Sequence, residues 1–400
     1  MQTKNIMEMA EKHLFNNYGV RDLALVRGSG THVWDADGNE YLDFFCGIAV
    51  TSLGHCHPEV VQAIKDQAEK LMHVSNLYLM VPQTELARRL TEVSFADRCF
   101  FCNSGAEANE SAMKLARKYW SDKGSTRRDI IYANKSFHGR TLATLAATGQ
   151  NKYRAGFDPL PPGFKSVEFN DVSALECAVD ENTAAILLEP IQGEGGVNMP
   201  DDAYLPGVRK LCDQHGILLI LDEVQVGVGR TCELFAHQGL GVEPDMMTLA
   251  KAIGGGLPLG VMLAKEELVG VLSPSSHAST FGGNPVCCAA GLATLEVLTS
   301  EEFLPHAASV SKRLFHKARD LKDQYDFIVD VRGRGMIIGI EMTVDVSDIV
   351  RKMRDKGVLI GTAGANVLRM LPPLVALEDE VDHVFDLLDG ILRESSGGAQ

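Results

Sequence analysis

The sequence predicts an α/β protein in which helices cover both faces of a mostly parallel β-sheet. Between about residues 95 and 264, short apolar segments alternate with longer amphipathic ones. Several of these segments are apolar at every position, above all 217–221, whereas a strand with one solvated face would be apolar at every second position. After Phe281 the pattern of apolar residues changes and predicts helical stretches with a few strands. This indicates a second, smaller unit of the α+β type.

The alternating region predicts the strands of the main sheet. They are expected at residues 99–102, 129–133, 184–189, 216–222, 246–250 and 260–264. The later region is expected to hold a long helical stretch at 284–325, strands at 328–331, 336–342 and 367–371, and helices at 347–356 and 378–393. Near the start, Asp37 and Gly38 form the predicted turn of a hairpin between 31–34 and 40–44.

The 400 residues of the chain exceed what one hydrophobic core usually organises. We therefore expect an N-terminal segment, residues 1–50, that packs with the small domain, a large domain at 51–290, and a small C-terminal domain at 291–400. Disorder is expected only at the ends of the chain, notably at 395–400.

Charge and hydropathy exclude several classes of function. The chain has 38 basic and 53 acidic residues and a net charge of −15, which argues against a protein that grips the phosphate backbone of nucleic acid. No apolar run approaches the ~20 residues that span a bilayer, and the charged first residues do not resemble a signal peptide. We expect a cytoplasmic enzyme without nucleic-acid or membrane partners.

Nine scattered cysteines are typical of a compartment in which thiols stay reduced, and they form no disulfide framework. Cys99 and Cys102 have the spacing of a metal or redox pair, but in a strand their side chains would point to opposite faces. The sequence His55-Cys56-His57 has no second ligand cluster at zinc spacing, so a structural turn is the better interpretation. No metal site is expected.

A helix N-terminus follows the first predicted strand. Ser104 and Glu107 have the spacing of a capping box, and Gly124 is expected to end the helix. Its apolar stripe consists of Ala108, Ala112, Leu115, Ala116 and Tyr119. The strand delivers this N-terminus to the carboxyl edge of the sheet, where free N–H groups and the helix dipole favour a phosphate. A capped helix is more often only structural, so a phosphate site requires other functional residues at the same edge of the sheet.

Two further residues are expected at the same edge. Asp222 ends the all-apolar strand, where an acid can pair with a cationic ring nitrogen, although metal binding or simple capping would also place an acid there. Lys251 lies between an apolar strand and a glycine run that begins at Gly254. A lysine that must lose its proton to attack a carbonyl group benefits from such surroundings, and a solvated lysine at a strand end is the alternative. Together with the helix, these residues indicate one site.

Six motifs in fixed order resemble the class III aminotransferases, over about residues 25–374. They are Asn103-Ser104-Gly105-Ala106-Glu107-Ala108, Phe137-His138-Gly139-Arg140, Glu189-Pro190-Ile191-Gln192-Gly193-Glu194-Gly195-Gly196, Asp222-Glu223-Val224-Gln225, Lys251, and Ser279-Thr280-Phe281-Gly282-Gly283-Asn284-Pro285. The resemblance implies a pyridoxal-phosphate-dependent transferase of fold type I. In that fold the large domain, with a mostly parallel seven-stranded sheet, binds pyridoxal 5'-phosphate, and the enzyme works as a homodimer.

The resemblance also implies which residues bind the cofactor. They are Ser104, Gly105, Ala106, Phe137, Asp222, Gln225, Lys251 and Thr280. Phe137 would stack on the pyridine ring, Asp222 would pair with the ring nitrogen, and Gln225 would contact the phenolic oxygen. Thr280 would reach the phosphate in the neighbouring subunit. Lys251 would be the catalytic residue, which holds the cofactor and then acts as general acid and base.

Four residues resemble the substrate-binding residues of the family. Arg140 would grip the substrate α-carboxylate, since a planar guanidinium suits a carboxylate, although a surface arginine is the alternative. Ser279 would lie close to substrate. Glu194 resembles a switch glutamate whose partner in this chain is best matched by Arg369. Arg230 is expected to be a structural loop arginine.

The implied reaction moves the δ-amino group of N2-acetyl-L-ornithine to 2-oxoglutarate, a step of arginine biosynthesis that yields N-acetyl-L-glutamate 5-semialdehyde and L-glutamate. Ile48 stands where relatives that use free ornithine carry a tyrosine, which favours the acylated substrate. Another ω-amino donor is the alternative: succinylornithine, ornithine, N-succinyldiaminopimelate or 4-aminobutyrate. A pyridoxal-phosphate enzyme with a different reaction, or a regulatory protein that binds this cofactor, also stays open. A dinucleotide-binding oxidoreductase, suggested by Gly333, Gly335 and Gly339, is disfavoured because a strand pattern follows these glycines.

Overall fold

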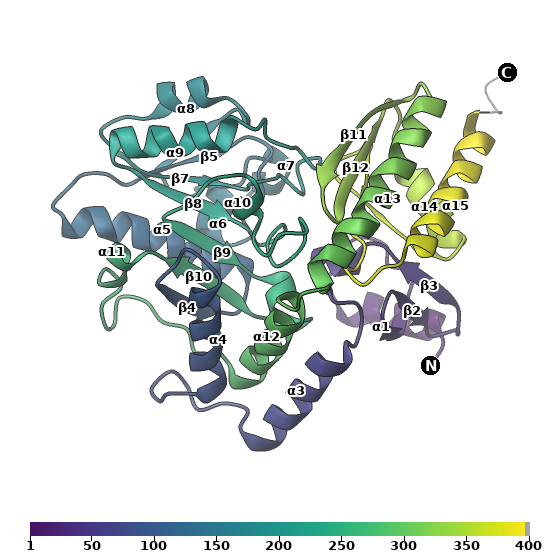
Figure 1. Cartoon of the computed structure of the whole chain (residues 1–400), viewed down its shortest axis with the longest axis horizontal. Helices are drawn as coiled ribbons and strands as arrows, with labels where there is room; N and C mark the ends of the chain where they lie inside the picture. Colours follow the sequence, from purple (N-terminus) through teal and green to yellow (C-terminus); the bar gives the residue numbers. More distant parts are fainter. Residues whose placement is uncertain (397–400) are drawn as a thin grey trace.

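The computed structural model describes residues 1–396, of which the last two are described only in their backbone. The chain folds into two lobes that lie side by side (Figure 1). The larger lobe, on the left, is built on a seven-stranded sheet, and the smaller one, on the right, on a four-stranded sheet. Strands from the N-terminal segment lie below the smaller lobe.

The seven-stranded sheet confirms the predicted α/β fold. Its strands, in spatial order, are β4 (Arg98–Cys102), β10 (Gly260–Ala264), β9 (Met246–Leu249), β8 (Leu218–Asp222), β7 (Thr183–Leu188), β5 (Asp129–Ala133) and β6 (Phe164–Val167). Only β10 runs antiparallel to its neighbours in this sheet. All the predicted strands are present, with ends that differ by at most two residues. The prediction missed β6, a short edge strand in which only Val167 is fully buried.

Successive residues of the central strands pack on opposite layers. Ile130 of β5 belongs to a core with α5 (Gly105–Asp122), whereas Ile131 belongs to a core with α9 (Tyr204–His215). Every residue of β7, β8, β9 and β10 is buried, which is why these segments are apolar at all positions except Thr183, Asp222 and Thr248. The layers are completed by α3 (Pro58–Lys70), α4 (Val81–Glu92), α6 (Leu142–Ala146), α7 (Asn151–Arg154), α8 (Val172–Ala178), α10 (Ala236–Gly239), α11 (Glu266–Val269), α12 (Pro285–Leu298) and the 3-10 helix η1 (Lys251–Gly254).

The smaller lobe pairs antiparallel strands in the order β11 (Ile328–Arg334), β12 (Ile337–Met342), β15 (Val367–Met370) and β14 (Gly361–Thr362). It carries α13 (Phe303–Gln324), α14 (Ser347–Asp355) and α15 (Glu378–Ser396). The predicted helical stretch at 284–325 is two helices, α12 and α13. The Thr299 and Ser300 hydroxyl groups donate to carbonyl groups of the last turn of α12, at 2.8 Å each, and such local bonds compete with helix continuation.

The N-terminal segment contains α1 (Thr3–His13) and the predicted hairpin, β2 (His32–Asp35) and β3 (Glu40–Asp43). Strand β1 (Leu25–Ser29) pairs with β2, and β13 (Val358–Leu359) pairs parallel to β3, which joins this segment to the smaller lobe. The Asp35 carboxylate closes the turn by accepting bonds from the Asp37 and Asn39 N–H groups at 3.0 and 2.8 Å. The His55 ring lies 2.7 Å from the Asp43 carboxylate. The described residues contain no cluster of three side chains that could hold a metal ion.

The short helix α2 (Cys46–Ala49) is left-handed. All its residues have positive φ: 52° at Cys46, 61° at Gly47, 64° at Ile48 and 63° at Ala49. This conformation is costly for residues with a Cβ atom. The Asp43 carboxylate supports the turn by accepting bonds from the Phe45 and Cys46 N–H groups at 2.9 and 3.0 Å.

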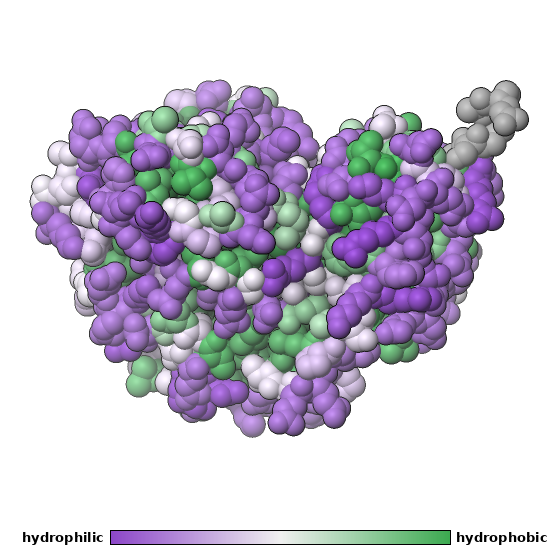
Figure 2. All heavy atoms as spheres, turned by 45° about the horizontal axis from the view of Figure 1, so that its top comes forward, coloured by the Kyte–Doolittle hydropathy of each residue, from purple (hydrophilic) through white to green (hydrophobic). Residues whose placement is uncertain are grey.

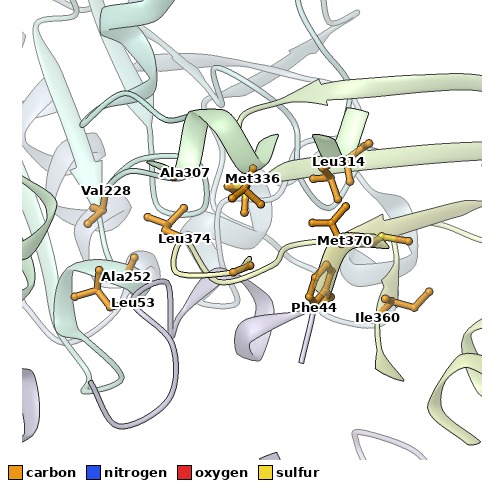
Figure 3. Close-up of a cluster of buried hydrophobic side chains, with 14 of the residues drawn as sticks. Phe44, Leu53, Val228, Ala252, Ala307, Leu314, Met336, Ile360, Met370 and Leu374 are labelled. Carbon is orange, nitrogen blue, oxygen red and sulfur yellow. The ribbon is translucent and has the colours of Figure 1, made fainter. Parts of the chain in front are cut away.

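One hydrophobic core crosses both lobes. It includes Phe44 from the N-terminal segment, Val228 and Ala252 from the larger lobe, and Leu314 and Met370 from the smaller one (Figure 3). The domain boundaries at residues 50 and 290 therefore remain predictions. The predicted disorder at 395–400 falls mostly on residues 397–400, which lie outside the described residues, while 395 and 396 belong to the helical backbone of α15. No helix in the described part of the chain is long and apolar enough to span a membrane.

Arg230 joins three parts of the molecule. Its guanidinium is fully buried and donates to the carbonyl groups of Met336, at 2.9 Å, and Pro372, and to the Ser52 hydroxyl at 2.7 Å. Burial lowers its pKa, and no carboxylate pairs with it among the described residues. These contacts agree with the expected structural role, since they tie a loop of the larger lobe to the smaller lobe and the N-terminal segment.

We expect Arg230→Ala to lower the free energy of unfolding by about 3–5 kcal/mol, because it leaves buried carbonyl groups without donors and opens a cavity. Thermal unfolding followed by circular dichroism measures the change. Arg351→Ala is the matched control, because Arg351 forms only exposed ion pairs within α14, and such pairs contribute little to stability. Equal melting temperatures for the two variants would contradict the role given to Arg230.

Candidate functional site

A cavity of about 510 Å³ opens at the carboxyl edge of the seven-stranded sheet. Its walls follow the ends of β4, β5, β7, β8 and β9, so five strands contribute to one site. The surface has a notch where the two lobes meet (Figure 2). The sequence-predicted residues that line the cavity are Ser104, Gly105, Ala106, Phe137, Arg140, Glu194, Asp222, Gln225 and Lys251. Ser279, Thr280 and Arg369 do not line it.

The N-terminus of α5 forms one end of the cavity. Ser104 caps the helix by accepting a bond from the Glu107 N–H group at 3.2 Å, as predicted. In a standard capping box the Glu107 carboxylate would accept a bond from the N–H group of the cap residue, Ser104. Here it accepts instead from the N–H group of Asn103, one residue earlier, at 2.8 Å. Gly105 and Ala106 lie in the first turn, where N–H groups have no carbonyl partner within the helix.

Asp222 lies in a network of donors at the end of β8. Its Oδ2 accepts from Asn109 Nδ2 at 2.7 Å and lies 2.7 Å from His138 Nδ1, and its Oδ1 accepts from the Val224 N–H group at 3.0 Å. Thr248 in turn donates to the Asn109 side chain at 2.7 Å. His138 Nε2 has no hydrogen-bond partner among the described residues. Oδ1 keeps accepting capacity for a further donor.

Lys251 lies two residues after the end of β9 and begins the 3-10 helix with a left-handed φ of 49°. Such a conformation is rare outside glycine and is typical of functional sites. Burial lowers the pKa of the Lys251 ammonium to about 8; the charge of Glu194 opposes this shift, and the charge of Arg369 adds to it. About one-tenth of the amine is therefore neutral and nucleophilic at pH 7, far more than for an exposed lysine.

Glu189 is a cavity residue to which the sequence analysis gave no role. Its side chain accepts a bond from the Phe137 N–H group at 3.0 Å, and only 6% of the residue is exposed. Burial, and secondly the charge of Asp222, raise its pKa well above the usual value. A protonated Glu189 presents a hydrogen-bond donor to the cavity without adding negative charge. Glu189 belongs to one of the quoted motifs, but only the buried geometry reveals its charge state.

Arg140 is exposed at the cavity wall and stacks on aromatic rings. Its guanidinium carbon lies 4.0 Å from the centre of the Tyr153 ring and 5.2 Å from that of Phe137. It makes no hydrogen bond or ion pair within residues 1–396, so its fork of donors is free to bind a carboxylate. Sequence reasoning missed Tyr153, which also meets the Phe137 ring edge-on at 5.7 Å.

Glu194 and Arg369 lie in contact, as their expected pairing requires. Arg369, on β15, is 2% exposed, and its Nη1 donates to Glu194 at 2.6 Å, to the Gly193 carbonyl at 3.1 Å and to Gln225 at 3.2 Å. Gln225 donates to the same Glu194 oxygen at 3.0 Å. Burial tends to raise the pKa of Glu194, but the charge and hydrogen bond of Arg369 lower it below its usual value. Glu194 lines the cavity and Arg369 lies behind it.

Besides Arg369, the expected site residues Ser279 and Thr280 lie outside the cavity. The Ser279 hydroxyl accepts from Asn103 Nδ2 at 3.2 Å, and Asn103 lines the cavity, so Ser279 is a near neighbour. Thr280 is exposed to solvent beside Phe281, which is 61% exposed. Ile48 is 38% exposed and does not line the cavity of the single chain, although Val50 does.

Comparisons with known proteins place the chain in a family. The family model for class III aminotransferases matches residues 15–392, and the chain belongs to this family. It is 50% identical to the acetylornithine aminotransferase of Methanocaldococcus jannaschii over 98% of this chain and 99% of that protein. It is 51% identical to the acetylornithine aminotransferase of Caldanaerobacter subterraneus subsp. tengcongensis, over 96% of this chain and 98% of that one.

A solved structure has the same fold. It is the ornithine aminotransferase of Toxoplasma gondii, crystallised with oxidised glutathione and with pyridoxal phosphate partly occupying its active site. The TM-score is 0.92 at 34% identity, and the match covers 96% of this chain and 93% of that one. The present chain is thus an aminotransferase of fold type I.

The Lys251 amine of the unliganded protein should titrate near pH 8, because burial lowers its pKa, whereas exposed lysines titrate near ~10.4. Below that pH it is protonated and unreactive. Competitive acylation at a series of pH values, resolved by peptide mass spectrometry, measures this, with the exposed lysines as internal standards. Glu194→Gln should move the midpoint lower and Arg369→Gln higher, since these charges act in opposite directions. A Lys251 profile that coincides with the standards would rule out the neutral amine.

Proposed function

We propose that this chain transfers the δ-amino group of N2-acetyl-L-ornithine to 2-oxoglutarate, giving N-acetyl-L-glutamate 5-semialdehyde and L-glutamate, with pyridoxal 5'-phosphate as cofactor. The observation that carries the proposal is the Lys251 amine, depressed in pKa and facing the same cavity as Asp222 and the N-terminus of α5. Relatives about half identical over nearly the whole chain are acetylornithine aminotransferases. The reaction would serve arginine biosynthesis, and a cytoplasmic location is part of the proposal.

The cavity fits the proposed cofactor. Its volume of about 510 Å³ lies within the range of small-molecule sites, ~300–1,000 Å³. The amide groups of Gly105 and Ala106 would hold the phosphate at the positive end of α5. Phe137 would cover the ring, and Asp222 would use its remaining accepting capacity on the ring nitrogen. When bound, pyridoxal phosphate supplies an electron sink for negative charge at the substrate carbon.

The residues of the chain then do the remaining work. Lys251 Nζ would take the proton from the δ-carbon of the substrate and later return a proton, which suits an amine with a pKa near 8. Asn109 and His138, which also line the cavity, orient the Asp222 carboxylate through its Oδ2. Burial and the charge of Asp222 raise the pKa of Glu189, and in its neutral form Glu189 would add a donor to the cavity without a second negative charge.

Arg140 would bind the α-carboxylate of the acylated substrate, since its donors are free and Tyr153 supports its plane. The acyl group removes the charge of the α-amino nitrogen. Ile48 offers no partner to a free ammonium at that position, and an unpaired charge in a closed site costs several kcal/mol by order of magnitude. These features support the acylated substrate over free ornithine.

Glutamate brings a second carboxylate, for which Arg369 is the proposed partner. Arg369 is held by the Gly193 carbonyl and Gln225 and lies 5.3 Å from the Phe45 ring centre, so it stays in place without Glu194. The side chain of Glu194 is 20% exposed and that of Arg369 2%, which makes Glu194 the member of the pair that can turn away. Glu194 would therefore mask Arg369 for the acylated substrate and release it for glutamate.

A homodimer is part of the proposal. Leu77, Tyr78, Leu79 and Val81 are 68–94% exposed, and such clusters of large apolar residues mark interfaces. The Asn76 side chain ties this segment to the carbonyl groups of Ser279 and Gly282, on both sides of Thr280 and the exposed Phe281. Since Thr280 lies outside the cavity of its own chain, it is available to the phosphate site of a second chain.

Three alternatives compete with this proposal. Another ω-amino donor would keep the same residues and change only the preferred substrate. A racemase, aminomutase or decarboxylase would use the cofactor without forming glutamate, and a regulatory protein would bind the cofactor without turnover. Glutamate formation with a panel of donors separates all of these.

In that panel, 2-oxoglutarate is the acceptor and glutamate is followed enzymatically. We expect N2-acetyl-L-ornithine to give the highest kcat/KM, with free ornithine lower by roughly two orders of magnitude because of its unpaired ammonium. Lys251→Ala should abolish turnover. Equal or better kcat/KM for free ornithine would overturn the substrate assignment, and normal turnover by Lys251→Ala would overturn the mechanism.

The two half-reactions should respond differently to Arg369→Ala. The glutamate half-reaction should slow by at least ~30-fold, because the second carboxylate loses its partner, while the acetylornithine half-reaction changes far less. Glu194→Ala should instead favour the glutamate half-reaction, since Arg369 is then always available. Stopped-flow spectroscopy of each half-reaction measures both effects. Equal losses in the two half-reactions for Arg369→Ala would make the arginine merely structural.

A further inference from the structure

The segment Gly193–Val197, which carries Glu194, belongs to the larger lobe but is held by the smaller one. It follows β7, and three strands of the smaller sheet contact it. Arg369 of β15 donates to the Gly193 carbonyl at 3.1 Å. On β12, a Cβ atom at Gly339 would lie 2.9 Å from the Val197 Cβ, so the backbone of that strand packs directly against the segment. The third contact is Arg332 of β11.

Arg332 holds the C-terminal end of the segment through hydrogen bonds from its guanidinium. Its Nη2 donates to the Gly196 carbonyl at 2.7 Å, and its Nε to the carbonyls of Gly196 and Val197 at 3.0 and 3.1 Å. Its Nη1 donates to Asp330 at 3.0 Å and to Glu341. The two acids balance the charge within the smaller lobe, so the remaining donors are committed to the segment.

The segment has little freedom elsewhere. A Cβ atom at Gly193 would lie 1.8 Å from Gln225 Oε1, and Gly196 has a φ of +126° that favours glycine. Asn198 donates to the Gly195 carbonyl at 3.1 Å. The backbone around Glu194 is therefore fixed between the two arginines, and its carboxylate reaches Arg369 from a preset position.

We propose that Arg332 is a positioning residue that sets how tightly Glu194 masks Arg369. Arg332 touches neither the cavity nor Glu194; it fixes the backbone that carries Glu194. Without these bonds, holding Glu194 against Arg369 costs more conformational entropy, so the masked state weakens. This inference rests on the proposed masking of Arg369 by Glu194.

The test compares two unreactive ligands of equal chain length on the cofactor-loaded enzyme. Glutarate, a five-carbon dicarboxylate, needs Arg369 unmasked, whereas valerate, the matching monocarboxylate, does not. Isothermal titration calorimetry gives both Kd values, and their ratio cancels general damage to the site. We expect Arg332→Ala to raise the preference for glutarate by roughly threefold to tenfold, the size of an indirect coupling between neighbouring groups.

A second variant and a matched control accompany this measurement. Arg332→Lys keeps the charge beside Asp330 and Glu341 but cannot bridge two carbonyl groups, so a smaller rise in the same direction is expected. It also serves if Arg332→Ala does not fold. Arg313→Ala removes an arginine of the same lobe that pairs with Asp382 and does not touch the segment, so it should leave the preference unchanged.

The Glu194→Ala background separates the two proposals. If Glu194→Ala alone leaves the glutarate preference unchanged, the masking proposal fails. If Glu194→Ala raises it but Arg332→Ala and Arg332→Lys do not, only the role of Arg332 fails. In the Glu194→Ala background, Arg332→Ala should have no further effect on the ratio; an equal rise in both backgrounds, or a lower preference for glutarate, would overturn the positioning role.

Discussion

The chemistry of the cavity depends on one constraint, the partial burial of the Lys251 side chain among charged groups at the edge of the sheet. Removing water lowers the pKa of this amine, and it also raises the energy of every charge nearby. The carboxyl groups around it respond in three ways. The pKa of Glu189 is raised, Asp222 is surrounded by donors, and Glu194 pairs with Arg369. The site is therefore a balanced set of charges.

Much of this site could be predicted from the sequence because parallel strands bring their carboxyl ends together. The residues after successive strands meet in space although they are far apart in the chain, and Asp222 and Lys251 were found in this way. Contacts between the lobes follow no such rule. Arg369 is 175 residues from Glu194, and only the resemblance suggested the pair. No pattern in the sequence pointed to Arg332 or Tyr153, because each acts through a contact with residues that are distant in the chain.

The fold was predictable where burial is complete. Strands β7 to β10 are buried at every residue, so their segments are almost entirely apolar and easily recognised. Strand β6, at the edge and only partly buried, lacks that pattern. The break between α12 and α13 depends on the hydroxyl groups of Thr299 and Ser300, which a periodicity of apolar residues does not register. The positive φ values of α2 were equally invisible, because three of its residues carry a Cβ atom.

That left-handed turn has a consequence for how the enzyme can evolve. The backbone around Ile48 already bears a strain of about 1–2 kcal/mol per residue, supported by Asp43 and by the buried Cys46 and Ala49. Isoleucine, branched at Cβ, is among the worst residues for this conformation, and its side chain is partly exposed. An unbranched replacement at this position would thus relieve strain without disturbing the core. The residue at position 48 can therefore change without a folding cost from this strain.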